Sequence, residues 1–272
     1  MADSGRQGRA GAGTALVTGA SSGIGLELAR AFAAAGHDLV LSARSEGKLV
    51  ALAEELRSAH GVAVRVVVAD LGRPDGAGRL FEEVEAVGVR VDVLVNNAGV
   101  GIHGPFAGTS LARELESIQL NVTSLTELTK RFLPGMLERR RGRILNVASV
   151  AGFVPGPFMA VYYATKAYVV SLSVALREEL SGTGVTVTVL APGPTRTGFE
   201  ATAGTSETRL FRQPGVMTAR DVAEAGLQGT LAGKDIVVPG AWNRVQASAS
   251  GLAPRWLTAK ITRRLQDPAD ER

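Results

Sequence analysis

The sequence contains no cysteine and only three histidines, and these absences exclude several kinds of site. Without cysteine there are no disulfides, thiolate nucleophiles or cysteine-ligated metals, which suits a reducing cytoplasm. The histidines match no zinc-ligand spacing, so we expect no metal site. They are His37, His60 and His103.

Long hydrophobic runs are also missing. No stretch of about 18 apolar residues occurs, which argues against a transmembrane helix. Residues 1–13 are polar and glycine-rich and lack the apolar core of a signal peptide, so we expect a disordered leader on a cytoplasmic protein. The net charge is only +4, and the obvious clusters of cations are residues 139–143 and the C-terminal tail, so nucleic acid is not an expected partner.

Short apolar runs rich in β-branched residues alternate with longer segments of helical periodicity. This alternation predicts a doubly wound parallel sheet in a three-layer α/β/α arrangement, and 272 residues suit a single domain over residues 14–240. The expected strands cover residues 14–18, 38–42, 62–68, 91–95, 143–147, 185–190 and 235–238. The expected helices cover residues 24–35, 48–59, 78–87, 111–137, 163–180 and 219–231.

Three glycines, Gly19, Gly23 and Gly25, lie between the first expected strand and the first expected helix. Glycine permits a sharp turn and lets a pyrophosphate approach the backbone. The helix that follows offers free N–H groups and the positive end of its dipole to the phosphates. The pattern predicts dinucleotide binding, with a role in packing alone as the alternative.

The glycine spacing, three residues and then one, resembles that of the short-chain dehydrogenase/reductase family. Further landmarks of that family follow in the same order over about residues 14–238: Asn96-Asn-Ala-Gly99, Ser149, Tyr162 with Lys166, and Pro192-Gly193. The resemblance implies a Rossmann-like fold and an oxidoreductase that interconverts a ketone and a secondary alcohol, of carbonyl or 3-oxoacyl type. It also implies a homodimer or homotetramer. The alternative is a non-catalytic dinucleotide sensor on the same fold.

The expected catalytic residues are Asn121, Ser149, Tyr162 and Lys166. Tyr162 and Lys166 are four residues apart in an expected helix and so share one face. An ammonium nearby would lower the pKa of the phenol from about 10. The resemblance assigns proton transfer to Tyr162, the carbonyl oxygen to Ser149 and the nicotinamide ribose to Lys166. Spacing alone does not exclude Tyr163, but the family pattern selects Tyr162.

Asn121 lies inside a long helical segment, where its amide competes for backbone groups. By resemblance it bends the helix and holds a water in the proton relay. The resemblance also places Asp70 at the adenine and Thr195 at the carboxamide. The full expected cofactor set is Gly19, Ser21, Ser22, Gly23, Ile24, Gly25, Arg44, Asp70, Asn97, Ala98, Gly99, Tyr162, Lys166, Pro192, Gly193 and Thr195.

The form of the cofactor depends on the end of the second expected strand. NAD-specific proteins carry an acid there for the ribose 2′-hydroxyl, whereas this chain has Ala43 followed by Arg44. A guanidinium pairs with a 2′-phosphate through two bonds. We therefore expect NADP(H), with NAD(H) as the second choice; a solvated Arg44 is the alternative interpretation.

Substrate specificity is expected from three segments, residues 100–106, 150–160 and about 193–217. Phe153, Val154, Phe158, Met159 and Phe199 suggest an apolar pocket, or simply core. Residues 241–272 read as a basic amphipathic extension, with Leu252, Trp256, Ile261 and Leu265 near helical spacing. Three roles stay open for it: packing on its own core, covering a partner subunit, or, as the least favoured, peripheral membrane contact.

Overall fold

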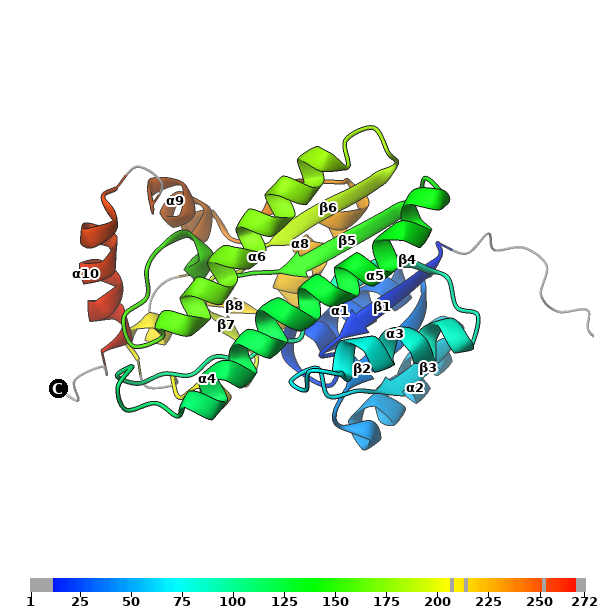
Figure 1. The fold of residues 1–272 in the computed structure, drawn as a ribbon, viewed down its shortest axis with the longest axis horizontal. Coiled ribbons are helices and arrows are strands. Elements are labelled where there is room, and N and C mark those ends of the chain that lie inside the picture. The colour runs from blue at the N-terminus through cyan, green and yellow to red at the C-terminus, as the bar shows by residue number, and fades with distance from the viewer. Residues whose placement is uncertain (1–11, 206–207, 213–214, 251–252, 268–272) are drawn as a thin grey trace, which may run out of the picture.

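Seven parallel strands form the centre of the computed structural model, which describes the chain apart from residues 1–11, 206–207, 213–214, 251–252 and 268–272 (Figure 1). The strand order is β3-β2-β1-β4-β5-β6-β9. This confirms the predicted doubly wound sheet. The strands are β1 (Thr14–Thr18), β2 (Asp38–Ala43), β3 (Val64–Val68), β4 (Val91–Asn96), β5 (Gly142–Val147), β6 (Val185–Leu190) and β9 (Ile236–Val237).

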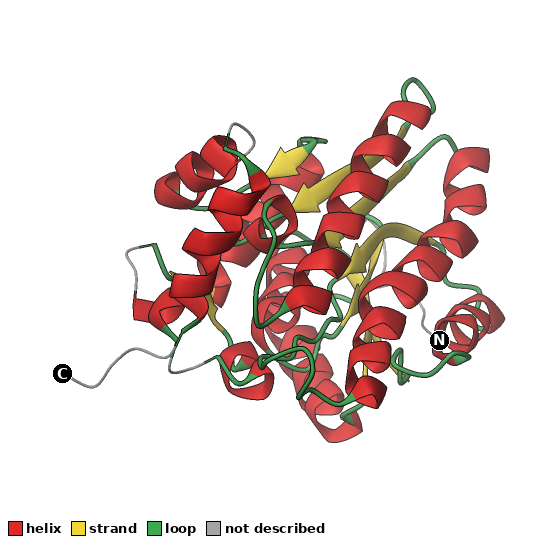
Figure 2. Cartoon of the chain, turned by 60° about the vertical axis from the view of Figure 1, so that its left-hand side comes forward, coloured by secondary structure: helices red, strands yellow, loops and turns green. Residues whose placement is uncertain are grey.

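Helices cover both faces of the sheet, as Figures 1 and 2 show. On one face the core joins the strands to α1 (Gly23–Ala34), α2 (Glu46–His60) and α8 (Ala219–Leu231). The other face packs against α3 (Gly76–Ala86), α5 (Leu125–Glu138) and the end of α6 (Ala160–Glu179). Because both faces are covered, the strands are almost continuously apolar, as the sequence shows.

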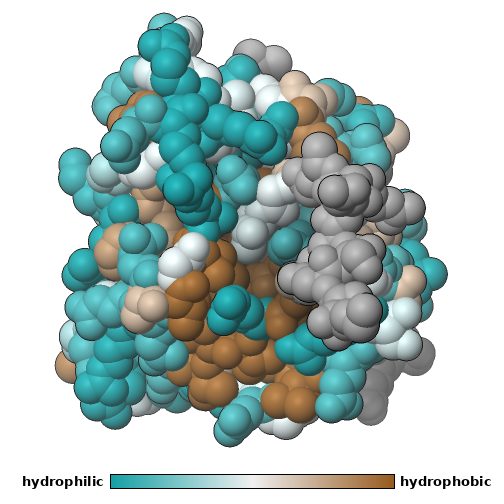
Figure 3. Space-filling model, turned by 90° about the vertical axis from the view of Figure 1, so that its right-hand side faces the viewer, coloured by the Kyte–Doolittle hydropathy of each residue, from teal (hydrophilic) through white to brown (hydrophobic). Residues whose placement is uncertain are grey.

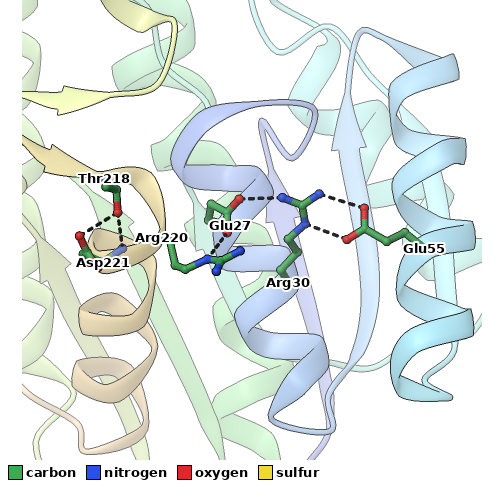
Figure 4. Close-up of polar contacts among 6 residues, drawn as sticks. All are labelled: Glu27, Arg30, Glu55, Thr218, Arg220 and Asp221. Atoms are coloured by element: carbon green, nitrogen blue, oxygen red, sulfur yellow. Dashed lines mark hydrogen bonds and ion pairs between the residues drawn. The ribbon is translucent and has the colours of Figure 1, made fainter.

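Ion pairs on the outer side of α1 link this helix to its neighbours α2 and α8 (Figure 4). The guanidinium of Arg30 pairs with Glu27 on its own helix and with Glu55 on α2. Arg220, at the start of α8, lies 3.7 Å from the second oxygen of Glu27. The hydrogen bond from Arg30 lowers the pKa of the Glu55 carboxyl. These contacts tie the three helices of this face together at the surface.

The structure departs from the predicted elements in three places. The helical segment expected over residues 111–137 is α4 (Leu111–Ile118), a π-helical turn Gln119–Ser124, and α5. The region after β6 adds β7 (Thr195–Arg196), α7 (Phe199–Ala203) and β8 (Met217–Thr218), with β7 and β8 paired. The tail is two helices, α9 (Ala241–Ser250) and α10 (Arg255–Gln266). Its residue Leu252 and most of the expected leader lie outside the described residues.

The order of the strands reverses between β1 and β4, which are hydrogen-bonded neighbours. In such sheets a crevice opens at the carboxyl ends of the strands at this point. Figure 1 places α9 and α10 beyond the same edge. Figure 3 faces the opposite side, where apolar surface gathers below the middle of the view within a hydrophilic surround. No helix among the described residues has the length and apolar character needed to span a bilayer.

Candidate active site

The glycine turn between β1 and α1 is built for close approach of a ligand. Gly19 and Gly23 have φ of 66° and 57°, in the left-handed region that favours glycine. A Cβ on Gly25 would lie 2.4 Å from the carbonyl oxygen of Gly19. Ser22 precedes α1 without capping it through its side chain, so its hydroxyl leaves the first-turn N–H groups unbonded. Such a turn fits a pyrophosphate.

Asn97 holds this turn from the next strand. Its Nδ2 donates to the carbonyl oxygen of Thr18 at 2.8 Å, and its own backbone N–H donates to the Thr18 hydroxyl. Asn97 therefore has a structural bond as well as a place in the cavity lining. Its neighbour Asn96 is buried and donates to Asn146 and Thr129, which joins β4 to β5 and α5.

Two cations lie beyond the turn, at the end of β2. Arg44 is exposed and lies 3.7 Å from Glu116, and Lys48 follows one helical turn later on α2. Both line the cavity. Lys48 was not predicted from the sequence, although its spacing of four residues from Arg44 was a usable signal. Asp70 accepts a bond from the backbone of Gly72 through Oδ1 at 3.0 Å.

Ser149, Tyr162 and Lys166 meet at the other end of the same crevice. Ser149 follows β5, and its hydroxyl donates to the carbonyl oxygen of Pro192 at 3.3 Å and accepts from Ala151. Tyr162 and Lys166 come from the first turns of α6, with the ammonium 5.8 Å from the centre of the phenol ring. Lys166 donates to the carbonyl oxygen of Val147 at 2.8 Å.

Burial changes the expected electrostatics of this pair. It raises the pKa of the Tyr162 phenol above its usual value of 10, and a hydrogen bond with Ser149 opposes the rise only in part. It also lowers the pKa of Lys166 to about 8. We expected from the sequence that the ammonium would lower the phenol pKa. In the structure the net shift of the phenol pKa is upward, because desolvation of the buried phenol outweighs any effect of the ammonium, which bonds to Val147.

Tyr163 lines the same crevice, but its hydroxyl is bonded to the C-terminal helix. Its hydroxyl accepts a hydrogen bond from Nε2 of Gln266 on α10 at 2.9 Å. A Cβ on Gly156 would lie 2.2 Å from its ring, so the ring fills the space over that glycine. Burial raises the pKa of Tyr163 to about 12. Tyr163 thus joins α6 to the C-terminal helix, a link that the sequence did not indicate.

Asn121 lies in the π-helical turn, fully buried and outside the cavity lining. Its side chain donates to the carbonyl oxygen of Val100 at 2.8 Å and accepts from the Val100 N–H at 3.0 Å. It also donates to the hydroxyl of Thr165, next to Lys166. The local departure from α-helical geometry agrees with the expected bend, and the contacts position the segment that follows Gly99.

The loop after β6 forms the remaining wall. The hydroxyl of Thr195 donates to the carbonyl oxygen of Gly193 at 2.9 Å, and Thr195 pairs with Met217 through β7 and β8. Gly193 packs against Asn243 of α9, with no room for a Cβ. Thr197, which was not predicted from the sequence, approaches Gly23 of the glycine turn and lines the cavity.

A single cavity of about 650 Å³ connects these parts. All the expected cofactor residues line it, from Gly19 to Thr195. Of the five apolar residues expected at the substrate, Met159 and Phe199 line it, whereas Phe153, Val154 and Phe158 do not. Leu210 and Phe211 add apolar side chains to the lining and Gln266 adds an amide; none of the three was predicted from the sequence.

His103 is tied to α10, because its Nε2 lies 3.0 Å from the carbonyl oxygen of Gln266. It does not line the cavity. Among the described residues, no group of three or more His, Cys, Asp or Glu side chains is placed to hold a metal ion.

Comparison with known proteins agrees with this geometry. The family model described as short chain dehydrogenase matches residues 13–208. The chain belongs to the short-chain dehydrogenase/reductase family. As a member it is a dinucleotide-binding oxidoreductase that acts on a CH–OH or C=O group, and the resemblance found in the sequence is confirmed.

Two curated relatives and two solved structures show how close the match is. "Ketoacyl reductase HetN" of Nostoc sp. is 38% identical over 78% of this chain and 73% of that protein. "Sulfoacetaldehyde reductase 2" of Chromohalobacter salexigens is 39% identical over 77% and 84%. A short-chain dehydrogenase from Sphingobium yanoikuyae, solved with NADPH, is 36% identical with a TM-score of 0.77, over 88% of this chain and 94% of that one. A "bulky-bulky ketone specific alcohol dehydrogenase" from Comamonas testosteroni is 32% identical with a TM-score of 0.74, over 88% and 93%.

Proposed function

We propose that this enzyme is an NADP(H)-dependent reductase that interconverts a ketone and a secondary alcohol, with Tyr162 as its proton donor. One observation carries the proposal. The same cavity holds the glycine turn at one end and Ser149, Tyr162 and Lys166 at the other. A dinucleotide laid along it would place its reactive ring beside these three side chains.

When bound, the nicotinamide supplies the hydride that adds to the carbonyl carbon. The Ser149 hydroxyl orients the carbonyl oxygen, and Tyr162 gives that oxygen its proton as the C=O double bond becomes a single bond. The raised phenol pKa keeps the proton on Tyr162 until then. The Lys166 ammonium, fixed by Val147, stabilises the phenolate that remains. Asn121 helps to position Lys166 through its hydrogen bond to the neighbouring Thr165.

Separate Phe substitutions at the two adjacent tyrosines test the assignment. Tyr162→Phe is expected to lower kcat by about 10³-fold or more, since it removes the proton donor but leaves the cavity intact. Tyr163→Phe is expected to retain turnover, because Tyr163 bonds to Gln266. Turnover is followed through NADPH absorbance over a panel of ketones. The opposite result would transfer the role to Tyr163, and NADPH binding without any turnover would favour the non-catalytic sensor.

The preference for NADP(H) is supported by the two cations after β2. Arg44 and Lys48 both line the cavity, and Ala43 leaves no acid at the strand end. The relative from Sphingobium yanoikuyae was solved with NADPH. Arg44→Asp is expected to raise the KM for NADPH by tenfold or more and to lower that for NADH. Arg65→Asp, an exposed site elsewhere, is the control. An unchanged cofactor preference would contradict the role of Arg44.

The substrate is proposed to be an uncharged, apolar ketone. Among the described lining residues the cations are Arg44, Lys48 and Lys166, so the substrate end offers no further positive charge for an anionic group. Met159, Phe199 and Phe211 give it an apolar surface instead. The ketoacyl and bulky-ketone activities in the names of the relatives agree with this class. Bulky aryl or alkyl ketones should therefore be reduced with higher kcat/KM than short sulfonated aldehydes.

We also propose a homodimer or homotetramer. Leu111, Leu115 and Ile118 on α4 are exposed, as are Tyr168 and Val174 on α6. Such apolar surface on neighbouring helices is typical of subunit contacts. Light scattering during size-exclusion chromatography should give a mass of two or four chains, and a monomer would contradict this.

A further inference from the structure

The C-terminal helix α10 docks on the enzyme by its polar side. Its buried residues are Thr258, Thr262 and Gln266, spaced four apart, and Gln266 reaches Tyr163. The apolar residues point the other way: Trp256 is 63% exposed, Ile261 50% and Leu257 37%. A helix that belongs only to its own core buries its apolar stripe. In α10 that arrangement is reversed.

The exposed side of α10 is also uniformly basic. Residues 241–266 contain no aspartate or glutamate. Lys260 and Arg264 lie among the exposed apolar residues, and the Lys260 ammonium sits 5.2 Å above the Trp256 ring. At 100° per residue, Trp256, Leu257, Lys260, Ile261 and Arg264 fall within an arc of about 140°. None of these cations forms an ion pair with a described carboxylate.

We propose that this outer face of α10 docks onto an anionic lipid surface. A tryptophan, two aliphatic residues and flanking cations on one side of a helix are the composition of an interfacial helix, which lies in the membrane plane. The cations would meet the lipid phosphates while the apolar side chains enter the headgroup boundary. The polar stripe of α10 then faces the protein, as observed. Trp242 and Val245 add exposed apolar surface on α9, next to the cation of Arg244.

Charge makes a second copy of the chain a poor occupant of this face. In a two-fold dimer the same patch lies on both sides of the interface. Where the two-fold axis passes through this face, cations would meet cations, with no acid between residues 241 and 266 to compensate. An anionic membrane supplies the missing charge at every position.

Membrane docking would also bring lipid close to the substrate end of the cavity. Gln266, on the inner side of α10, lines that cavity. The diameter of a helix, about 10 Å, would then separate the cavity from the membrane surface. That the substrate could reach the cavity from the lipid rests on the proposed function, in which the substrate is an apolar ketone. The docking of α10 on the lipid surface does not depend on the substrate.

Co-sedimentation of the full chain with vesicles tests the proposal. Vesicles of phosphatidylcholine with one third phosphatidylglycerol should sediment the protein at low salt, and binding should weaken as salt rises. Vesicles of pure phosphatidylcholine should sediment little of the protein. Failure to sediment with the anionic vesicles would overturn the proposal, whether or not the enzyme reduces ketones.

Two double variants and their matched controls locate the surface. Leu257→Ser with Ile261→Ser, and Lys260→Gln with Arg264→Gln, should each lower vesicle partitioning roughly tenfold or more. Val50→Ser with Val87→Ser removes comparable exposed apolar surface elsewhere, and Arg65→Gln with Arg90→Gln removes the same charge; both should bind like the parent. We expect all variants to fold, because no buried residue of α10 is changed, and circular dichroism checks this. Equal binding by all variants would refute docking through α10.

Fluorescence gives an independent readout, because the chain has only two tryptophans. In a Trp242→Phe background, Trp256 emission should shift to shorter wavelength when anionic vesicles are added. An unshifted spectrum would contradict insertion of this face. Loss of oligomers in the α10 variants without any vesicle binding would instead identify the face as a protein–protein surface, which also overturns the proposal.

Discussion

The amide of Gln266 donates to the phenol of Tyr163 across 2.9 Å, and this bond ties the C-terminal helix to the residue beside the proposed proton donor. Both side chains are buried. Gln266 also contacts Met159, a lining residue of the cavity. The position of α10 is therefore coupled to the substrate end of the active site.

Breaking this bond is expected to loosen α10 while leaving the sheet intact. Tyr163→Phe leaves the buried amide nitrogen of Gln266 with only the thioether of Met159 as an acceptor and should lower the free energy of unfolding by about 1–2 kcal/mol. A double-mutant cycle with Gln266→Leu should give a coupling energy of about 1 kcal/mol. Hydrogen exchange of the α10 amides should speed up in either single variant. Additive effects would contradict the link.

Gly25→Ala should weaken both folding and cofactor binding. The new Cβ would meet the backbone oxygen of Gly19 at 2.4 Å, which can be relieved only by shifting the turn. We expect NADPH affinity to fall at least about tenfold and stability to fall by about 1–3 kcal/mol. Gly47→Ala, with open space around it in α2, is the control and should be neutral or slightly stabilising. Calorimetric titration and urea unfolding measure the two effects.

Lys166→Met should stabilise the cofactor-free protein while removing activity. Burial lowers the lysine pKa from 10.5 to about 8, which corresponds to about 3 kcal/mol of destabilisation at neutral pH. Part of the gain is lost because Val147 keeps an unpaired carbonyl, so a net gain of about 1–3 kcal/mol is expected.

The stability gained by Lys166→Met should depend on pH in a defined direction. The folded-state pKa lies below the unfolded one, so the penalty is complete below pH 8 and disappears as the pH rises to 10.5. The difference in unfolding free energy between variant and parent should shrink over that window. Lys130→Met, at an exposed site, should show no such trend. A less stable Lys166→Met at pH 7 would contradict the account.

The lowered pKa of Lys166 also predicts a descending limb in the pH profile of kcat/KM. As pH rises through about 8, Lys166 in the free enzyme loses its proton and stops stabilising the Tyr162 phenolate, so kcat/KM for ketone reduction should fall. Tyr163→Phe should keep this limb. Lys166→Arg should lose it, at reduced rate, because guanidinium does not titrate there. A parent profile that is flat to pH 9.5 would argue against the role of Lys166.

His37 should make the fold sensitive to mild acid. It is buried immediately before the start of β2, with Nδ1 3.2 Å from the Gly13 carbonyl oxygen and its ring against Phe32. Desolvation lowers its pKa below 6.5. Its contribution to stability is therefore complete above pH 6.5 and is lost as the pH falls through the folded-state value. His37→Asn should remove this slope from the unfolding free energy, whereas His60→Asn, at an exposed position, should retain it.

The strands and the glycine turn could be predicted because their signals are local. The runs that became β1 and β6 have the predicted bounds, and α8 does too. The long helix was predicted without its π-helical turn, because the bonds from Asn121 to Val100 that accompany it join residues that periodicity does not relate. The tail's basic amphipathic pattern was visible, but its orientation was not.

By itself, the sequence determined the doubly wound sheet, the family and the edge at which Gly19, Ser149 and Tyr162 gather, since periods of two and 3.6 residues and glycine turns act over short stretches of chain. Only the tertiary structure decided that Gln266 donates a hydrogen bond to Tyr163, that Trp256 of α10 is exposed, and that burial raises the pKa of Tyr162. These depend on desolvation and on contacts between segments about a hundred residues apart, which no local pattern encodes.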